Sequence, residues 1–318
     1  MNLPDLLLRV ECYVGLRDAI GYAVRYEEKL LKDFVRFVAS QDVSSPIRAH
    51  MAIDWACTSV PGRGPAGKAG RLKVVRGFLS HLRAALPETE VPGPGVLAPI
   101  RRPTPYLYSQ SEIEGLMHEA LRLGPKGSLR PHVYCTLIGL LASSGLRVGE
   151  ALQLNVDDVR LDATTPHLHI VEGKFRKSRL VPLHATTAEK LAAYAKERKR
   201  LCCDALSDAF FVSERGGHIN YDACWDTFGG LLRRNGIRKN VGGGRPGIHA
   251  LRHSFAIGRM VEWYRTGMTV KELLPNLSVY LGHVQPAHTY WYLTATPELL
   301  GSAADRFLQY AGVGGRHD

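Results

Sequence analysis

Six prolines lie between residues 87 and 105, in the stretch PETEVPGPGVLAPIRRPTP. Proline fixes φ and lacks a backbone N–H, so neither a helix nor a central strand can run through this stretch. The chain of 318 residues is also longer than one hydrophobic core usually grows. We therefore expect two domains, residues 1–90 and 106–318, joined by an extended linker over residues 91–105.

The first domain is predicted to be helical. An apolar stripe at steps of three and four residues predicts a helix over residues 20–41, and its members are Ile20, Ala23, Tyr26, Leu30, Phe34 and Phe37. The segments RAHMAIDWAC and RLKVVRGFLSHLRAAL predict two further helices. In the second of these, one face carries Leu72, Val75, Phe78 and Leu82. The segment between the two helices, SVPGRGPAGKAG, is expected to be a glycine-rich loop.

Positive charge is concentrated in the first domain. The whole chain carries a formal charge of +11, and the segment from Thr58 to Pro87 has six basic residues and no acidic one. Charge runs are usually solvated surface, but positive charge without interruption favours a surface that faces phosphates. The residues predicted to contact nucleic acid are Arg63, Lys68, Arg71, Lys73 and Arg76, with Lys177 from the second domain.

The second domain is predicted to be mainly helical with a small antiparallel sheet. A helix is expected to begin with Ser109 or Ser111 as its N-cap, because Glu112 and Glu114 then lie near the positive end of the helix dipole. Two β-prone runs, residues 167–172 and 178–184, flank the polar turn GKFRK and predict a hairpin. Lys174 and Lys177 both belong to this turn.

The cysteines and apolar runs indicate a cytoplasmic protein. The six cysteines form no CxxC pair and have no zinc-ligand spacing, so we expect reduced thiols and no metal site. The N-terminus lacks the form of a signal peptide, and no apolar run approaches the roughly 18 residues of a membrane span. No membrane association is expected.

Five short segments of the second domain carry residues suited to phosphate chemistry. They are ASSGLRVGEALQL with Arg147 and Glu150, VEGKFRKSRLVPL with Lys174, GIHALRHSFA with His249 and Arg252, LGHV with His283, and HTYWYL with Tyr292. In this order and spacing they resemble the tyrosine recombinase, or phage integrase, family. The resemblance covers essentially the whole second domain, and the first domain is similar by pattern to the family's helical core-binding (SAM-like) domain.

The resemblance implies a site-specific recombinase that cuts and rejoins double-stranded DNA through a 3′-phosphotyrosyl intermediate. It implies a C-shaped clamp of two domains around the duplex, a synaptic tetramer on DNA, and no cofactor. Integration, excision or transposition of a mobile element is the expected context. The target sequence is not encoded in these motifs.

Two arginines and a lysine are candidates for handling the phosphate. The planar, permanently charged guanidiniums of Arg147 and Arg252 can each hold two phosphate oxygens, and Glu150 is placed to orient Arg147. Lys174 is the candidate proton donor to the leaving 5′ oxygen, with Lys177 in the same turn as the alternative. By the resemblance, the lysine directly after the glycine takes this role.

The nucleophile is expected to be Tyr292, which follows His283 at the family's nine-residue spacing. Tyr290 is assigned to packing, because residues two apart on a helix point in nearly opposite directions. His249 and His283 are expected to bind the phosphate or assist the nucleophile's proton, whereas His253 is interpreted as a supporting residue.

Two alternatives remain open at this point. A type IB topoisomerase uses similar chemistry but relaxes any supercoiled DNA without a partner site. A non-catalytic accessory protein derived from an integrase would bind DNA without forming a covalent complex. The short spacing from His283 to Tyr292 and the presence of the first domain favour the recombinase, and the complete set of motif residues argues against the accessory protein.

Overall fold

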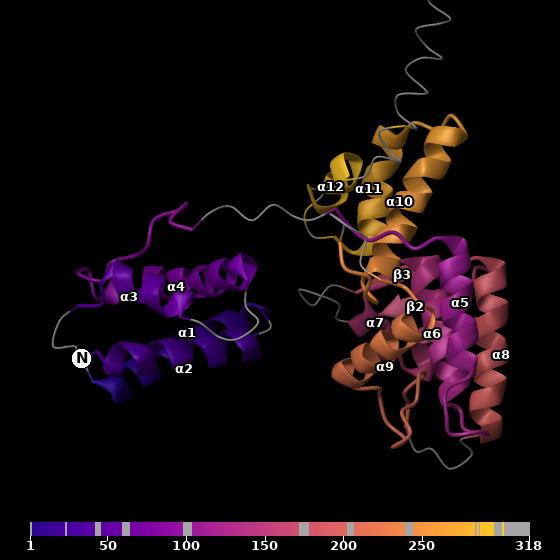
Figure 1. Cartoon of the computed structure of the whole chain (residues 1–318), viewed down its shortest axis with the longest axis horizontal. Helices are drawn as coiled ribbons and strands as arrows, with labels where there is room; N and C mark the ends of the chain where they lie inside the picture. Colours follow the sequence, from indigo (N-terminus) through magenta and orange to yellow (C-terminus); the bar gives the residue numbers. More distant parts are fainter. Residues whose placement is uncertain are drawn as a thin grey trace, which may run out of the picture. The chain divides into compact units, whose positions relative to one another are not determined.

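The computed structural model describes residues 2–22, 24–41, 46–58, 64–97, 104–171, 178–201, 207–238, 244–283, 285, 287–295 and 301. The chain divides into two compact units, Met1–Arg102 and Pro103–Asp318 (Figure 1). The division falls inside the stretch predicted as a linker. Its first part belongs to unit 1, because Val91 and Leu97 pack against the core of that unit.

Unit 1 is helical in its described part (Figure 1). Its helices are α1 (Leu3–Ala19), α2 (Arg25–Ala39), α3 (Ala49–Cys57) and α4 (Pro65–Ala85). The Asn2 side chain caps α1 by accepting a hydrogen bond from the backbone N–H of Asp5 at 3.0 Å. The helices pack around one core that includes Phe34, Trp55 and Phe78.

Two sequence predictions for unit 1 were wrong. The stripe predicted from residue 20 does not belong to one helix: the chain turns between α1 and α2, and Ile20 and Tyr26 are exposed. The predicted glycine-rich loop was placed too far along the chain, since α4 begins at Pro65. Proline suits this first position, because the first N–H groups of a helix have no acceptor within the helix. The apolar face predicted for α4 is confirmed, because Leu72, Val75, Phe78 and Leu82 are all buried in the core of unit 1.

Unit 2 combines helices with a small sheet (Figure 1). Its helices are α5 (Gln110–Leu121), α6 (Arg130–Ser144), α7 (Val148–Leu152), α8 (Ala185–Leu201), α9 (Tyr221–Arg234), α10 (Ala250–Arg265), α11 (Val270–Leu281) and α12 (Ala287–Ala295), with a 3₁₀ turn at Val156–Asp158. The predicted N-cap is confirmed at Ser109, whose side chain and that of Glu112 form a capping box at the start of α5.

The predicted hairpin forms the centre and one edge of an antiparallel sheet. Its strands are β1 (Val159–Arg160), β2 (His167–Ile170) and β3 (Arg179–Pro182), in the order β1-β2-β3. Leu168 pairs with Val181 and Ile170 with Arg179. Strand β1 was not predicted, because a two-residue strand is too short to show an alternating pattern.

Two apolar clusters hold unit 2 together. The larger one joins α5, α6, α7, the sheet, α8, α9 and the first turn of α10. The smaller one joins the rest of α10 to α11 and α12 and includes Tyr292. A helix is also expected from the segment TPELLGSAADRFLQY, residues 296–310, which lies outside the described residues apart from residue 301.

Candidate active site

Two helices of unit 2 end at glycines whose backbone is left-handed. Gly145 follows α6 with φ of 61°, and Gly282 follows α11 with φ of 70°. A Cβ at Gly145 would collide with the ring of Phe255, and one at Gly282 would lie 2.7 Å from Nη1 of Arg179. Both positions therefore require glycine for conformation and for space, which explains the glycines of the GLR and LGH motifs.

Three arginines converge on the C-terminal turn of α11. Arg179 Nε donates to the carbonyl of Tyr280 at 3.0 Å, Arg252 Nη2 to that of Leu281 at 2.7 Å, and Arg147 Nη2 to that of Gly282 at 2.6 Å, so three successive carbonyls are used. The last carbonyls of a helix lack intrahelical partners and carry partial negative charge. The helix end thus gathers guanidiniums from three different elements.

Arg252 also spans to the end of α6. Its Nη1 donates to the carbonyl of Gly145 at 2.7 Å, so one buried guanidinium connects the C-termini of α6 and α11. Arg147 lies two residues after Gly145 and begins α7 as its N-cap residue. The predicted pair of arginines is thereby brought to one place by two helix ends.

Glu150 joins two of the three arginines. Its carboxylate accepts hydrogen bonds from Arg147 Nη1 at 2.6 Å and from Arg179 Nη2 at 2.8 Å, and its side chain is 7% exposed. It also accepts from the backbone N–H of Arg147 at 3.1 Å. Burial acts to raise the pKa of Glu150, but the hydrogen bonds and charges of Arg179 and Arg147 outweigh it and lower the pKa. The expected contact of Glu150 with Arg147 is present.

The charges of this cluster do not balance. Arg147, Arg179 and Arg252 contribute three positive charges, and Glu150 contributes one negative charge. Within the described ranges, no carboxylate lies within ion-pair distance of Arg252, which is 2% exposed. Burial and then the charge of Arg147 lower the pKa of Arg252 to about 10, so it stays charged at neutral pH. The site therefore has an excess of positive charge that an anion can neutralise.

Tyr292 lies beside this cluster, on α12. It is 2% exposed, and its hydroxyl lies 2.9 Å from Nδ1 of His253. Its charge acts on the pKa of Arg252, which places the phenol within electrostatic reach of that guanidinium. Tyr290 is 46% exposed, and no hydrogen bond of its side chain is found within the described ranges. Of the two tyrosines, the structure brings Tyr292 to the arginines.

Three histidines surround Tyr292 and Arg252. Burial and then the charges of Arg252 and Arg147 lower the pKa of His283 to about 3, and its Nδ1 lies 2.7 Å from Oγ1 of Thr289. Burial, followed by His249 and Arg252, lowers the pKa of His253 to about 4. Burial of the imidazole, followed by the charges of Arg252 and Arg147, lowers the pKa of His249, although the residue as a whole is exposed. The rings of His253 and His283 are neutral at pH 7.

The predicted DNA contacts of unit 1 have different surroundings in the structure. Arg71 is 5% exposed: its guanidinium lies 3.9 Å from the Trp55 ring and donates to the Trp55 carbonyl, so its assignment to a DNA surface was wrong. Arg76 donates to the carbonyls of Pro92 and Gly93, both at 2.9 Å, and secures the start of the linker. Lys68 and Lys73 lie partly or fully at the surface.

Three predicted residues cannot be placed. Lys174, Lys177 and Arg63 lie outside the described residues. Strands β2 and β3 flank the segment of Lys174 and Lys177, and Arg179 in β3 binds Glu150.

Two residues close to the reacting groups were missed. Arg179 was quoted in the RLVPL run without a role, and the signal available was its position two residues before the buried Val181, on the same face of β3. His253 was interpreted as a supporting residue, but it contacts the Tyr292 hydroxyl. A helix places residues four apart on one face, so His249 and His253 share a face of α10.

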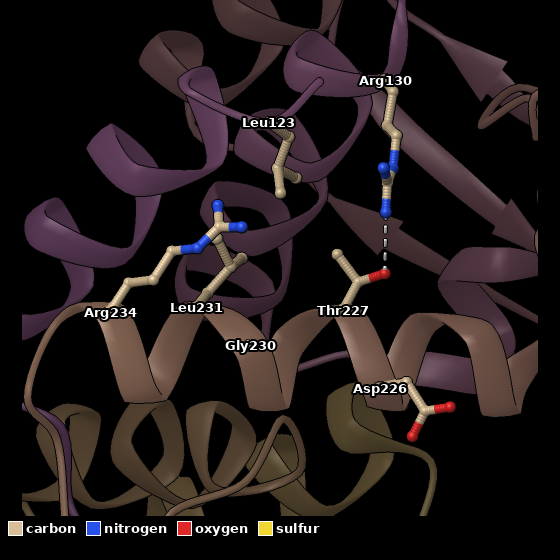
Figure 2. A pocket seen from close by; sticks show the side chains of 7 residues that line it. All are labelled: Leu123, Arg130, Asp226, Thr227, Gly230, Leu231 and Arg234. Atoms are coloured by element: carbon tan, nitrogen blue, oxygen red, sulfur yellow. Dashed lines mark hydrogen bonds between the residues drawn. The ribbon is translucent and has the colours of Figure 1, made fainter. Parts of the chain in front are cut away.

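A cavity of about 300 Å³ lies beside α9, and its lining holds none of the predicted site residues (Figure 2). Arg130 reaches Thr227 across it at 3.4 Å. Among the described residues, no group of three His, Cys, Asp or Glu side chains could hold a metal ion. Every described helix is too short or too polar to cross a membrane.

The sequence model of the phage integrase family matches residues 108–298, which include every predicted site residue of unit 2. The chain belongs to the phage integrase family. It is a site-specific tyrosine recombinase, an enzyme class that cleaves and rejoins DNA.

Curated relatives extend this match over both units. The chain is 40% identical over 304 residues to a putative integrase/recombinase, y4rB, of Sinorhizobium fredii, which covers 93% of this chain and 95% of the relative. It is 29% identical over 272 residues to the tyrosine recombinase XerD of Bifidobacterium longum, covering 83% and 80% of the two chains. The similarity to y4rB therefore includes the helical unit that the family model leaves out.

Solved structures share the fold. The Tn1549 transposon integrase, in complex with transposon right end DNA, matches with a TM-score of 0.67 at 14% identity, covering 98% of this chain and all of the other. The XerH recombinase in its post-cleavage complex with difH matches with a TM-score of 0.65 at 20% identity, covering 87% and 78%. The predicted fold class, mainly helical with a small antiparallel sheet, is confirmed.

Proposed function

We propose that this recombinase cuts and rejoins double-stranded DNA through a covalent link between Tyr292 and a 3′ phosphate. The observation that carries the proposal is that the buried Tyr292 side chain lies within electrostatic reach of Arg252, a buried guanidinium that donates to two helix-end carbonyls. A phosphodiester is the anion that a nucleophile beside such a charge can attack.

Arg147 and Arg252 bind the non-bridging oxygens of the scissile phosphate. Each guanidinium is oriented before DNA arrives, Arg147 by Glu150 and Gly282, and Arg252 by two helix ends. Such preorganised donors stabilise the charge of a pentacoordinate phosphorus without moving during the reaction. His249 and His283, both beside these arginines, add hydrogen bonds to the same oxygens.

Tyr292 gives up its phenolic proton to His249 or His283 and bonds to phosphorus, while the bond from phosphorus to the 5′ oxygen breaks. Lys174 gives its proton to that oxygen, with Lys177 as the alternative donor in the same turn. The phosphotyrosyl ester retains the energy of the original phosphodiester, so rejoining needs no nucleotide cofactor, and the charge on phosphorus is handled by arginines rather than by a metal ion.

Unit 1 acts as the core-binding domain, and both units bind the duplex. Lys68 and Lys73 of α4 are the remaining predicted phosphate contacts of the described part of this unit. The Tn1549 integrase and XerH structures are DNA complexes, which supports duplex DNA as the partner. We place the reaction in the cytoplasm, in a synaptic tetramer, and in the integration, excision or transposition of a mobile element.

A nicked suicide duplex tests the nucleophile. The sequence of the duplex is copied from the ends of the element that carries the gene. After cleavage, the short fragment with the free 5′ hydroxyl dissociates at the nick, so rejoining is prevented and the covalent adduct accumulates. Wild type and Tyr290→Phe should form the adduct, and Tyr292→Phe should bind DNA normally without forming it. An adduct with Tyr292→Phe would overturn the assignment.

The same duplex separates the alternatives. Binding without any adduct in wild type would identify an accessory protein. Relaxation of supercoiled plasmids that lack the element ends would identify a topoisomerase, whereas a recombinase should join only paired specific sites.

A further inference from the structure

We propose that His253 is the positioning residue of the nucleophile: its imidazole accepts the hydrogen bond of the Tyr292 hydroxyl at Nδ1 and sets the direction of the attacking oxygen. This inference rests on the proposed function, because it gives His253 a role in the reaction of Tyr292. The resemblance and the spacing of the motifs assign no such role to His253.

The geometry around the phenol singles out His253 among the nearby histidines. The Tyr292 oxygen lies 2.9 Å from Nδ1 of His253, a normal hydrogen-bond distance. His283 instead lies with its ring nearly parallel to that of Tyr292, 6.3 Å between centroids, and its Nδ1 contacts Thr289. His283 therefore packs on the face of the phenol, whereas His253 meets its reacting atom.

The surroundings keep the His253 ring neutral, so that one of its two nitrogens can accept a hydrogen bond. His249 packs edge-on against it at 4.9 Å, Trp291 lies at 5.9 Å, and the charge of Arg252 acts on it. Burial, then His249 and the charge of Arg252, lower the pKa of His253 to about 4, so its ring is neutral at pH 7. A neutral ring that accepts at Nδ1 carries its proton on Nε2.

An acceptor at this point has a direct consequence for the reaction. When the phenolic hydrogen points to Nδ1, the lone pairs of the oxygen are directed away from His253 and are available to phosphorus. The rotation of the hydroxyl is then restricted before DNA binds, which removes an ordering step from the attack.

Two substitutions separate acceptor position from packing. His253→Asn places an amide oxygen near the position of Nδ1, and His253→Leu fills similar space without an acceptor. With the nicked suicide duplex, we expect His253→Leu to form adduct about 10- to 100-fold more slowly than wild type, and His253→Asn to recover to within about threefold of it. DNA affinity should be unchanged in both. His118→Leu, on the exposed face of α5, is the matched control.

A substrate with sulfur in place of the leaving 5′ oxygen locates the defect on the nucleophile's side. A thiolate leaves without being protonated, so this substrate should restore the rate of Lys174→Ala. The rate of His253→Leu should remain low, because its defect concerns the attacking oxygen. Restoration of His253→Leu by sulfur would overturn the proposal.

The remaining outcomes distinguish a failure of the proposed function from a failure of the role proposed for His253. If wild type forms no adduct, the proposed function fails and the inference falls with it. If wild type forms adduct and His253→Leu matches it, the inference alone fails. If His253→Leu and His253→Asn are equally slow while their thermal stability equals that of wild type, the acceptor position is not what matters, and the proposal is overturned.

Discussion

Arg71 in unit 1 and Arg252 in unit 2 are both buried arginines, but their charges are handled in opposite ways. Arg71 stacks on Trp55 and pairs with Asp33 at 3.6 Å, so a ring and a carboxylate meet its charge. Arg252 donates to the carbonyls of Gly145 and Leu281, which are neutral groups. The first arginine has a carboxylate partner, whereas the second has no carboxylate at ion-pair distance among the described residues.

This difference shows what distinguishes a structural arginine from one that binds a ligand. Burial alone does not, because both side chains are almost fully covered. The deciding feature is whether the partners carry negative charge. Carbonyls at helix ends accept the N–H groups of the guanidinium and fix its position. Because they carry no net charge, the positive charge of the guanidinium remains available to a phosphate.

The largest effect is expected from Arg252→Lys. Lysine keeps the charge but cannot bridge two carbonyls and a phosphate with a planar fork, so we expect adduct formation to slow about 10²- to 10³-fold. DNA binding should be nearly unchanged. The rate is measured with the nicked duplex under single-turnover conditions, and a rate near that of wild type would remove Arg252 from the phosphate clamp.

Glu150→Gln is expected to have the next largest effect. The amide keeps the size of the side chain but loses the charge that holds Arg147 and Arg179, so adduct formation should slow by about 10-fold or more. The double variant Glu150→Gln with Arg179→Gln shows whether the two residues act together. A fully additive loss would mean that Glu150 acts on Arg147 independently of Arg179.

Arg71→Lys should affect stability and leave the chemistry intact. Loss of the guanidinium stacked on Trp55 is expected to cost about 1–2 kcal/mol of the free energy of unfolding. Hydrogen exchange of α3 and α4 measures this loss within the full chain. Adduct formation by the folded protein should match wild type, and a slower rate would mean that Arg71 and Arg252 are less different than their partners indicate.

The smallest effect concerns pH. The folded pKa values of His253 and His283, about 4 and about 3, lie below the value of about 6.5 expected for the unfolded chain. The unfolded state therefore binds more protons, and stability should fall as pH decreases from about 6.5 toward 4. Thermal unfolding of unit 2 should shift down by several degrees over this range, and by less in His283→Gln.

The candidate site of the second unit could be predicted from the sequence, because its residues occur in short motifs of fixed order and spacing. The predicted set of Arg147, Glu150, Arg252, His283 and Tyr292 occupies one site in the structure. The hairpin and the cap at Ser109 were also predicted, since alternation and capping are local patterns.

The errors in the first unit both arose because a local sequence pattern was interpreted without knowledge of tertiary contacts. A basic residue in a run without acids was taken as surface, but Arg71 lies next to the buried Leu72 and turns onto Trp55, a residue of another helix. The stripe from Ile20 to Tyr26 continued across the turn between α1 and α2, because periodicity alone does not show where a helix stops.

The sequence by itself determined the family, and it predicted the two-part organisation and the candidate site residues, because those depend on residue types at fixed intervals. Only the tertiary structure decided that the Tyr292 hydroxyl lies at hydrogen-bond distance from His253 and that the end of α11 gathers three guanidiniums. These facts depend on groups distant in the chain whose meeting is set by packing and by the unpaired carbonyls of a helix end.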